Sequence, residues 1–85
     1  MILTKLVGYT KFDYTDKATG VVTKKIQVCF EDTESVPEVG KIYSTFNFKA
    51  EKCPDFKKDD IGKDIIVELG KMDGGRKYGS SIVFR

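Results

Sequence analysis

The chain contains no histidine, which is the commonest general base near neutral pH. Neither Cys29 nor Cys53 therefore has a histidine to activate its thiol, and no GxSxG motif or P-loop occurs. The adjacent acids Asp59 and Asp60 are most simply part of a charged, solvated loop. We therefore expect a protein that is not an enzyme and that requires no cofactor.

Metal-ligand spacing is also absent, since the two cysteines stand far apart in the sequence. Without histidine, this excludes the usual zinc motifs. A disulfide between Cys29 and Cys53 is an alternative to two free thiols. Isolated cysteines in a chain without a secretory signal are more often free thiols. The start of the chain has no apolar signal region, and no apolar run approaches membrane-spanning length. We expect a cytoplasmic protein that makes no contact with a membrane.

Neither basic nor acidic residues predominate, and the net charge of the 85 residues is only +2. The distribution is more informative: residues 1–30 hold five bases and two acids, residues 31–60 five and eight, and residues 61–85 five and three. If the two basic ends meet in the fold, their potential would attract phosphate. A mixed, solvated surface accounts for the same charges equally well. Six Phe and four Tyr supply the core of one domain, residues 1–85.

Runs of strand-forming residues alternate with groups of turn-forming residues. Gly8 lies within the first run, where a glycine often marks a bulge or a sharp bend. Residues 51–62 have room for one helical turn that starts near Pro54, with Phe56 fixing it to the core. We predict strands over residues 2–14, 21–30, 42–50, 64–71 and 77–84, the first two forming one long hairpin.

Five short antiparallel strands with a covering segment after the third predict an all-β fold, an OB-like Greek-key barrel. An SH3-like barrel is the alternative. Alternation places Ile26, Val28 and Phe30 on one face of the second strand with Lys24, while Lys25 lies on the other. We assign three phenylalanines to the core: Phe46, Phe48 and Phe84.

Basic and aromatic residues are interleaved on the extended segments. This combination suits single-stranded nucleic acid, since cations follow the phosphates and aromatic rings stack on the bases. Strand tyrosines that merely cover the barrel, and outward lysines that protect strand edges, are the simpler alternative. The candidate binding residues are Tyr9, Lys11, Tyr14, Lys24 and Lys25 on the first hairpin, Tyr43 and Lys49 on the third strand, and Lys71, Arg76, Lys77 and Tyr78 at the last turn.

Three segments, residues 8–32, 40–51 and 61–84, resemble small single-stranded-DNA-binding proteins of filamentous phages and of related phage or plasmid elements of Gram-positive bacteria. The shared features are size, strand order, a long hairpin with tyrosine and lysine, and a basic glycine turn. The resemblance implies an OB-fold homodimer that coats single-stranded DNA cooperatively during replication or transfer. It assigns DNA contacts to Lys11, Tyr14, Lys24, Lys25 and Tyr43, and it places Arg76 and Lys77 on the final hairpin.

The chain departs from that family in two respects. Arginine is scarce, with only Arg76 and Arg85, although its planar cation stacks best on bases. An acidic segment, residues 31–38, falls where a loop that contacts DNA or forms the dimer is expected.

The sequence therefore predicts a non-catalytic protein that binds single-stranded DNA with little sequence preference, as a homodimer. RNA is an equally admissible ligand, because no residue is assignable to a 2′-hydroxyl contact. One alternative is a protein-interaction accessory module of a phage or mobile element that uses a strand edge or the acidic segment. Another is a small nuclease or RNA-processing subunit, which would need clustered carboxylates and a divalent ion.

Overall fold

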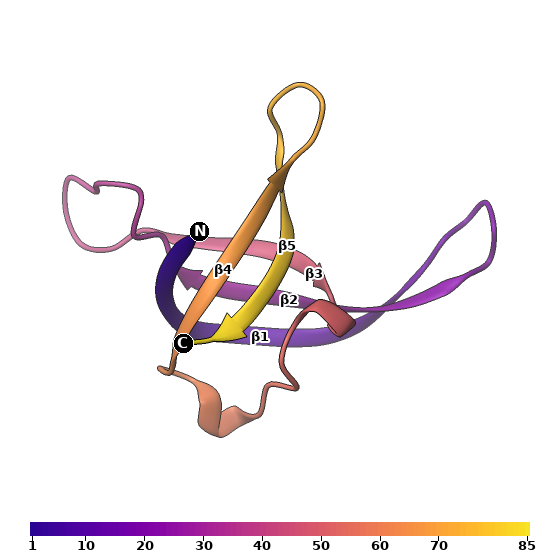
Figure 1. Ribbon diagram of the computed structural model, residues 1–85, viewed down its shortest axis with the longest axis horizontal. Helices are drawn as coiled ribbons and strands as arrows, with labels where there is room; N and C mark the ends of the chain where they lie inside the picture. Colours follow the sequence, from indigo (N-terminus) through magenta and orange to yellow (C-terminus); the bar gives the residue numbers. More distant parts are fainter.

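One long strand organises the protein, because it pairs with two different neighbours (Figure 1). The computed structural model describes all of residues 1–85, and its sheet has the strand order β3-β2-β1-β4-β5 with every pair antiparallel. The strands are β1 (Ile2–Thr15), β2 (Val22–Glu31), β3 (Tyr43–Lys49), β4 (Asp64–Lys71) and β5 (Lys77–Phe84). The all-β prediction is confirmed, and each strand lies within one residue of its predicted bounds.

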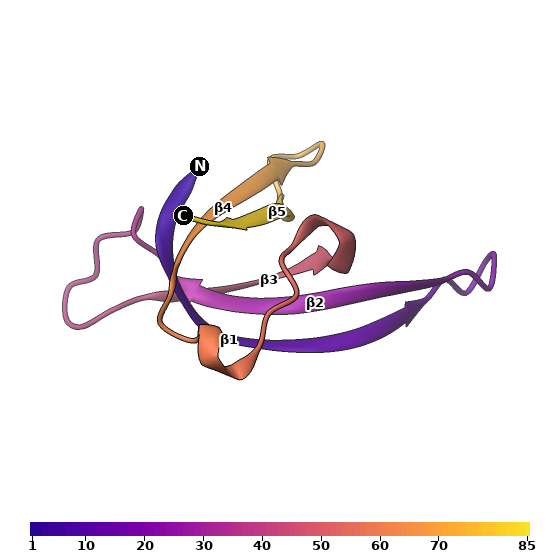
Figure 2. The ribbon, with the colours of Figure 1, turned by 60° about the horizontal axis from the view of Figure 1, so that its bottom comes forward.

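A bulge at Gly8 divides β1 into two parts. Residues 2–5 pair with β4, residues 6–15 pair with β2, and the register shifts between Leu6 and Gly8. A bulge bends its strand and increases the local twist, so β1 can pass from one strand pair to the other. The pair β4–β5 consequently lies over β1, β2 and β3 (Figure 2). The predicted bulge at this glycine is confirmed.

The edges of the sheet, β3 and β5, approach each other without joining. No backbone hydrogen bond connects them, so the sheet is not closed into a barrel. They are in contact at Gly79, where a Cβ atom would lie 2.6 Å from the carbonyl oxygen of Asn47 and 2.7 Å from the Phe48 ring. Real Cβ atoms do not come so close to other heavy atoms, so glycine permits this approach.

The core lies between the two strand layers and contains ten buried apolar side chains. They are Ile2, Leu6, Ile26, Val28, Phe30, Phe48, Phe56, Ile65, Val67 and Ile82. Phe48 is confirmed as a core residue, and Phe46 packs against the core while staying partly exposed. The prediction for Phe84 is wrong, because 41% of its surface is exposed. Phe84 ends β5, where its ring covers the edge of Phe56 with centroids 5.5 Å apart.

The segment between β3 and β4 contains two helical turns instead of the one predicted near Pro54. Single 3₁₀ turns, η1 (Ala50–Lys52) and η2 (Lys58–Asp60), lie on either side of a stretch without regular secondary structure, residues 53–57. Phe56 is buried in that stretch, as predicted, and its N–H donates to the carbonyl of Pro54 (2.9 Å).

Candidate nucleic-acid interface

The two faces of the β1–β2 hairpin have different surroundings. Residues directly opposite each other on paired strands share a face, so buried Ile26 and Val28 identify the inner face. Tyr9 is opposite Val28 and Lys11 is opposite Ile26, which puts both on the inner side. We call the opposite side of β1, β2 and β3 the outer face; its central residues are Tyr14, Lys25, Gln27, Tyr43, Thr45, Asn47 and Lys49.

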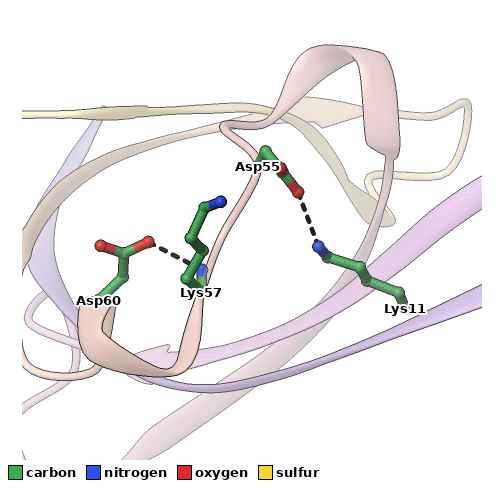
Figure 3. Close-up of polar contacts among 4 residues, drawn as sticks. All are labelled: Lys11, Asp55, Lys57 and Asp60. Carbon is green, nitrogen blue, oxygen red and sulfur yellow. Dashed lines mark hydrogen bonds and ion pairs between the residues drawn. The ribbon is translucent and has the colours of Figure 1, made fainter.

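On the inner face, Tyr9 and Lys11 hold the segment that follows β3. The Tyr9 ring is partly buried against Phe56, with centroids 5.7 Å apart. The Lys11 ammonium donates a hydrogen bond to a carboxylate oxygen of Asp55 at 2.8 Å (Figure 3). This bond raises the pKa of Lys11 and lowers the pKa of Asp55, because it favours the charged form of each. Both predicted binding residues therefore have a structural partner.

Asp60 fixes the same segment from its other end. Its carboxylate accepts a hydrogen bond from the Lys57 backbone N–H at 2.8 Å (Figure 3). It accepts a second one from the Lys63 ammonium, also at 2.8 Å. The bond from Lys63 is the main reason that the pKa of Asp60 lies below its ordinary value.

Cys53, in the same segment, is half-buried, and desolvation raises the pKa of its thiol to about 11. Both cysteines are free thiols in the structure.

A cavity of about 540 Å³ lies between the inner face and this segment. Lys11, Lys24 and Lys25 line it together with Asp13 and Asp55, so the two carboxylates offset two of the three positive charges. Lys24 is also directly opposite Asp13 on the paired strand. The cavity is therefore a poor site for a polyanion.

The outer face has cations without partners. Lys25 and Lys49 are directly opposite each other on β2 and β3, and neither forms an ion pair. Like charges in this position destabilise a sheet, and an anion bound between them would remove the repulsion. The Lys25 ammonium also lies 4.7 Å from the centre of the Tyr14 ring. Tyr14 is 49% exposed, so much of its surface remains open to solvent.

Tyr43 lies at the far end of the outer face from Tyr14. It is 53% exposed and is directly opposite Glu31, whose carboxylate pairs with Lys41 at 3.5 Å. The β2 partners of the two tyrosines, Thr23 and Glu31, are eight residues apart, or about 26 Å at about 3.3 Å per strand residue. The two rings thus bracket an extended surface with Lys25 between them.

The last hairpin carries a second pair of opposed cations. Lys71 and Lys77 face each other on β4 and β5, and the turn between them bears Arg76. Gly74 and Gly75 have φ values of 90° and 83°, a region that favours glycine. None of the three basic side chains forms an ion pair. With Asp73 as the one acid in the turn, the hairpin presents net positive charge at its tip.

A groove connects the last hairpin with the outer face. It has a volume of about 350 Å³ and lies where β5 approaches β3, with Lys25 on one side and Lys77 and Tyr78 on the other. The fold thus brings cations from both basic ends of the sequence around one surface. Sequence reasoning missed three polar residues of this groove, namely Gln27, Thr45 and Asn47. Strand alternation had put each on the polar side, but only the strand register shows that they meet.

No match was found when the chain was compared with models of protein families, with curated protein sequences and with solved structures. No three carboxylate or thiol side chains are grouped so that they could hold a metal ion. The only helical elements are three-residue turns, and no helix is long and apolar enough to cross a membrane. The positions and charges of the outer-face residues are therefore what indicate a function for this protein.

Proposed function

We propose that the protein binds single-stranded DNA on the outer face of β1, β2 and β3, without catalysis. One observation carries the proposal: Lys25 and Lys49 oppose each other without counterions on the surface between exposed Tyr14 and Tyr43. A sheet gains nothing from opposed lysines, whereas a phosphate between them would be stabilised by both.

Exposed tyrosines favour a single strand over a duplex. A ring can stack on a base only where the base face is free, and each such contact contributes about 1–3 kcal/mol. Tyr14, Tyr43 and Tyr78 are all about half exposed. Tyr14 and Tyr78 have lysines on neighbouring strand positions, whereas Tyr43 is directly opposite Glu31. Stacking and phosphate contacts alone would leave little sequence preference. Tyr9 and Lys11 are not part of the proposed surface, because they hold Phe56 and Asp55.

An OB-type barrel is part of the same proposal. Five antiparallel strands with β1 between β2 and β4 support it, as does the contact of β5 with β3 at Gly79. The OB fold is a partly open Greek-key barrel, so the absence of a hydrogen-bonded ladder between β3 and β5 is compatible with it. OB folds bind oligonucleotides on the surface of strands 2 and 3, which here carries Lys25 and Lys49.

The test is a titration with labelled oligo-dT of about 15 nucleotides and with duplex of equal length, followed by anisotropy at low and moderate salt. We expect oligo-dT to bind, to weaken steeply with salt, and to bind much more tightly than duplex. Tyr14→Ala and Tyr43→Ala should each weaken binding. Equal affinity for duplex, or no binding to oligo-dT at low salt, would overturn the proposal.

A homodimer in the cytoplasm, acting in the replication or transfer of phage or plasmid DNA, completes the proposal. An apolar stripe supports the dimer: Leu3, Ile66 and Val83 are directly opposite one another on β1, β4 and β5, facing away from the core. Light scattering should give twice the mass of one chain for the wild type and one chain for Val83→Lys. A monomeric wild type at working concentration would contradict the dimer without affecting the DNA proposal.

The loop between β2 and β3 favours a second candidate, a protein-interaction module. Val36 is 94% exposed and Val39 89% exposed, beside Glu34 and Glu38. The loop extends away from the sheet (Figure 1), and Asp32 holds its start by accepting hydrogen bonds from the Ser35 hydroxyl (2.8 Å) and the Ser44 hydroxyl (3.2 Å). If neither oligonucleotide binds at low salt, this loop becomes the better candidate surface.

A further inference from the structure

The chain contains a single glutamine and a single asparagine, Gln27 and Asn47, and the fold puts them side by side. They are directly opposite each other on β2 and β3, exposed on the outer face, and both line the groove between β3 and β5. Neither side chain forms a hydrogen bond within the protein. Their donors and acceptors are therefore free for a ligand.

An amide side chain has an adjacent donor and acceptor, which is the arrangement that recognises the edge of a base. Asparagine or glutamine pairs with adenine through two hydrogen bonds, to N6 and N7. Lysines bind the phosphate and tyrosines stack on the face of a base, and every nucleotide has both features. Gln27 and Asn47 are thus the only residues of the groove that can supply a paired amide contact.

Tyr78 supplies a flat surface at the same groove. Its ring covers Gly70, the residue directly opposite on β4, so closely that a Cβ at Gly70 would overlap the ring. The tip of the ring therefore lies over the backbone of β4 at Gly70, while Tyr78 remains about half exposed. The exposed part of the ring is available to stack on a base.

The size of the groove limits what it can hold. Its volume of about 350 Å³ lies at the lower end of the range for small-ligand sites, about 300–1,000 Å³. Lys25 and Lys77 flank it, so a phosphate on either side of a bound base would meet a cation. One nucleotide of a longer strand fits this description, and several do not.

We infer that the groove binds one base of the DNA strand, stacked on Tyr78 and read at its edge by Gln27 and Asn47, with a preference for adenine. The inference rests on the proposed function and adds to it. Most of the strand would be bound without regard to sequence, and one position would be selected. A purine also offers Tyr78 a larger ring surface than a pyrimidine does.

The test compares oligo-dT of about 15 nucleotides with the same strand carrying one central adenosine. We expect the adenosine strand to bind about tenfold more tightly, toward the lower end of the discrimination that one bidentate pair gives. Gln27→Leu and Asn47→Leu, of similar volume but without the amide, should each bring the ratio close to one. The ratio is taken within each variant, so a change in its affinity for oligo-dT itself does not enter the comparison.

Nuclear magnetic resonance gives an independent readout. Because the chain has one glutamine and one asparagine, the side-chain NH₂ region of a ¹⁵N spectrum contains only two pairs of signals. Each leucine variant identifies one pair. We expect both pairs to shift when the adenosine strand binds.

Three results would overturn the inference. They are a ratio of one in the wild type, a ratio that survives in the Gln27→Leu/Asn47→Leu double variant, and amide signals that do not move on binding. Each leaves the proposed function standing if oligo-dT still binds. Failure of oligo-dT to bind at all overturns both proposals, so the two failures are distinguishable.

Discussion

Tyr9 and Lys11 on one face of the first hairpin, and Tyr14 and Lys25 on the other, are the same residue types in different situations. The inner pair is engaged: Tyr9 packs on Phe56, and Lys11 bonds to Asp55 at 2.8 Å. The outer pair forms no side-chain hydrogen bond or ion pair, and the Lys25 ammonium lies 4.7 Å from the Tyr14 ring centre. A basic and aromatic composition therefore indicates a binding surface only where no protein group already satisfies the side chains.

The two tyrosines of β1 give the sharpest test of this comparison. Tyr9→Ala removes partly buried ring surface from the core edge, and we expect it to lower the free energy of unfolding by about 2–3 kcal/mol. Tyr14→Ala removes exposed surface and should change stability by less than about 0.5 kcal/mol. The same variant should weaken oligo-dT binding by about 1–3 kcal/mol, the contribution of one stacked base. Urea unfolding and anisotropy on both variants measure the two effects.

The conservative variants Tyr9→Phe and Tyr14→Phe are the matched controls, because each keeps the ring. Both should resemble wild type in stability and in binding. If Tyr14→Ala destabilised the protein as much as Tyr9→Ala does, the distinction between the faces would fail. If folded Tyr9→Ala lost as much affinity as Tyr14→Ala, the inner face would belong to the binding surface.

A double-mutant cycle at Gly70 and Tyr78 extends the comparison to the last hairpin. Gly70→Ala puts a methyl group where the tip of the half-exposed Tyr78 ring lies, and we expect the ring to swing away, which should cost less than about 1 kcal/mol of stability but weaken DNA binding by displacing the ring. In a Tyr78→Ala background the clash is gone, so Gly70→Ala should have almost no further effect on either quantity. Independent, additive effects would show that Gly70 does not position Tyr78.

The opposed lysines test the electrostatic part of the comparison. Lys49→Thr should reduce the slope of log affinity against log salt by about 0.7, the value for one phosphate contact to a single strand. Because it also removes a like-charge pair, it should leave stability unchanged or slightly higher. Lys11→Met is the control from the inner face and should leave the slope unchanged. An equal change of slope in both variants would mean that the face of a lysine does not decide its role.

Much of the fold was predictable because it depends on local signals. The alternation of Ile26, Val28 and Phe30 and the glycines of the turns were enough to give five strands and the bulge at Gly8. The helical turn near Pro54 and the burial of Phe84 were predicted incorrectly. Both depend on how the segment after β3 crosses the core, which local sequence does not encode.

The candidate site was predictable only in part, for a related reason. Alternation is enough to separate Tyr14 from Tyr9 and Lys25 from Lys24, because the members of each pair lie an odd number of residues apart. The partnership of Lys11 with Asp55, 44 positions away, required the fold. The meeting of Gln27 with Asn47 required the register of β2 and β3. Contacts between residues far apart in the sequence cannot be predicted from the alternation and turn signals of a single sequence.

The smallest expected effect concerns the pH dependence of stability, to which Asp60 and Asp55 of the segment between β3 and β4 contribute, as does Asp32 after β2. Bonds from Lys63 and from the Lys57 backbone lower the pKa of Asp60 below its ordinary value of 3.8, and a bond from Lys11 does the same for Asp55. Such a carboxylate contributes stability that is fully present above the unfolded pKa and is lost as pH falls through the lower, folded value. We therefore expect the urea midpoint to hold from pH 7 to about pH 5 and to decline below about pH 4.

Asp60→Asn separates this contribution from general acid denaturation. The variant should be less stable than wild type at pH 7, because the neutral amide gives up the charge that Lys63 stabilises. It should then lose less on acidification, so that the two urea midpoints converge toward pH 3. Tyr14→Ala, on the outer face, should follow the wild-type pH curve throughout. A constant offset between Asp60→Asn and wild type from pH 7 to pH 3 would mean that the Asp60 bonds do not depend on its charge.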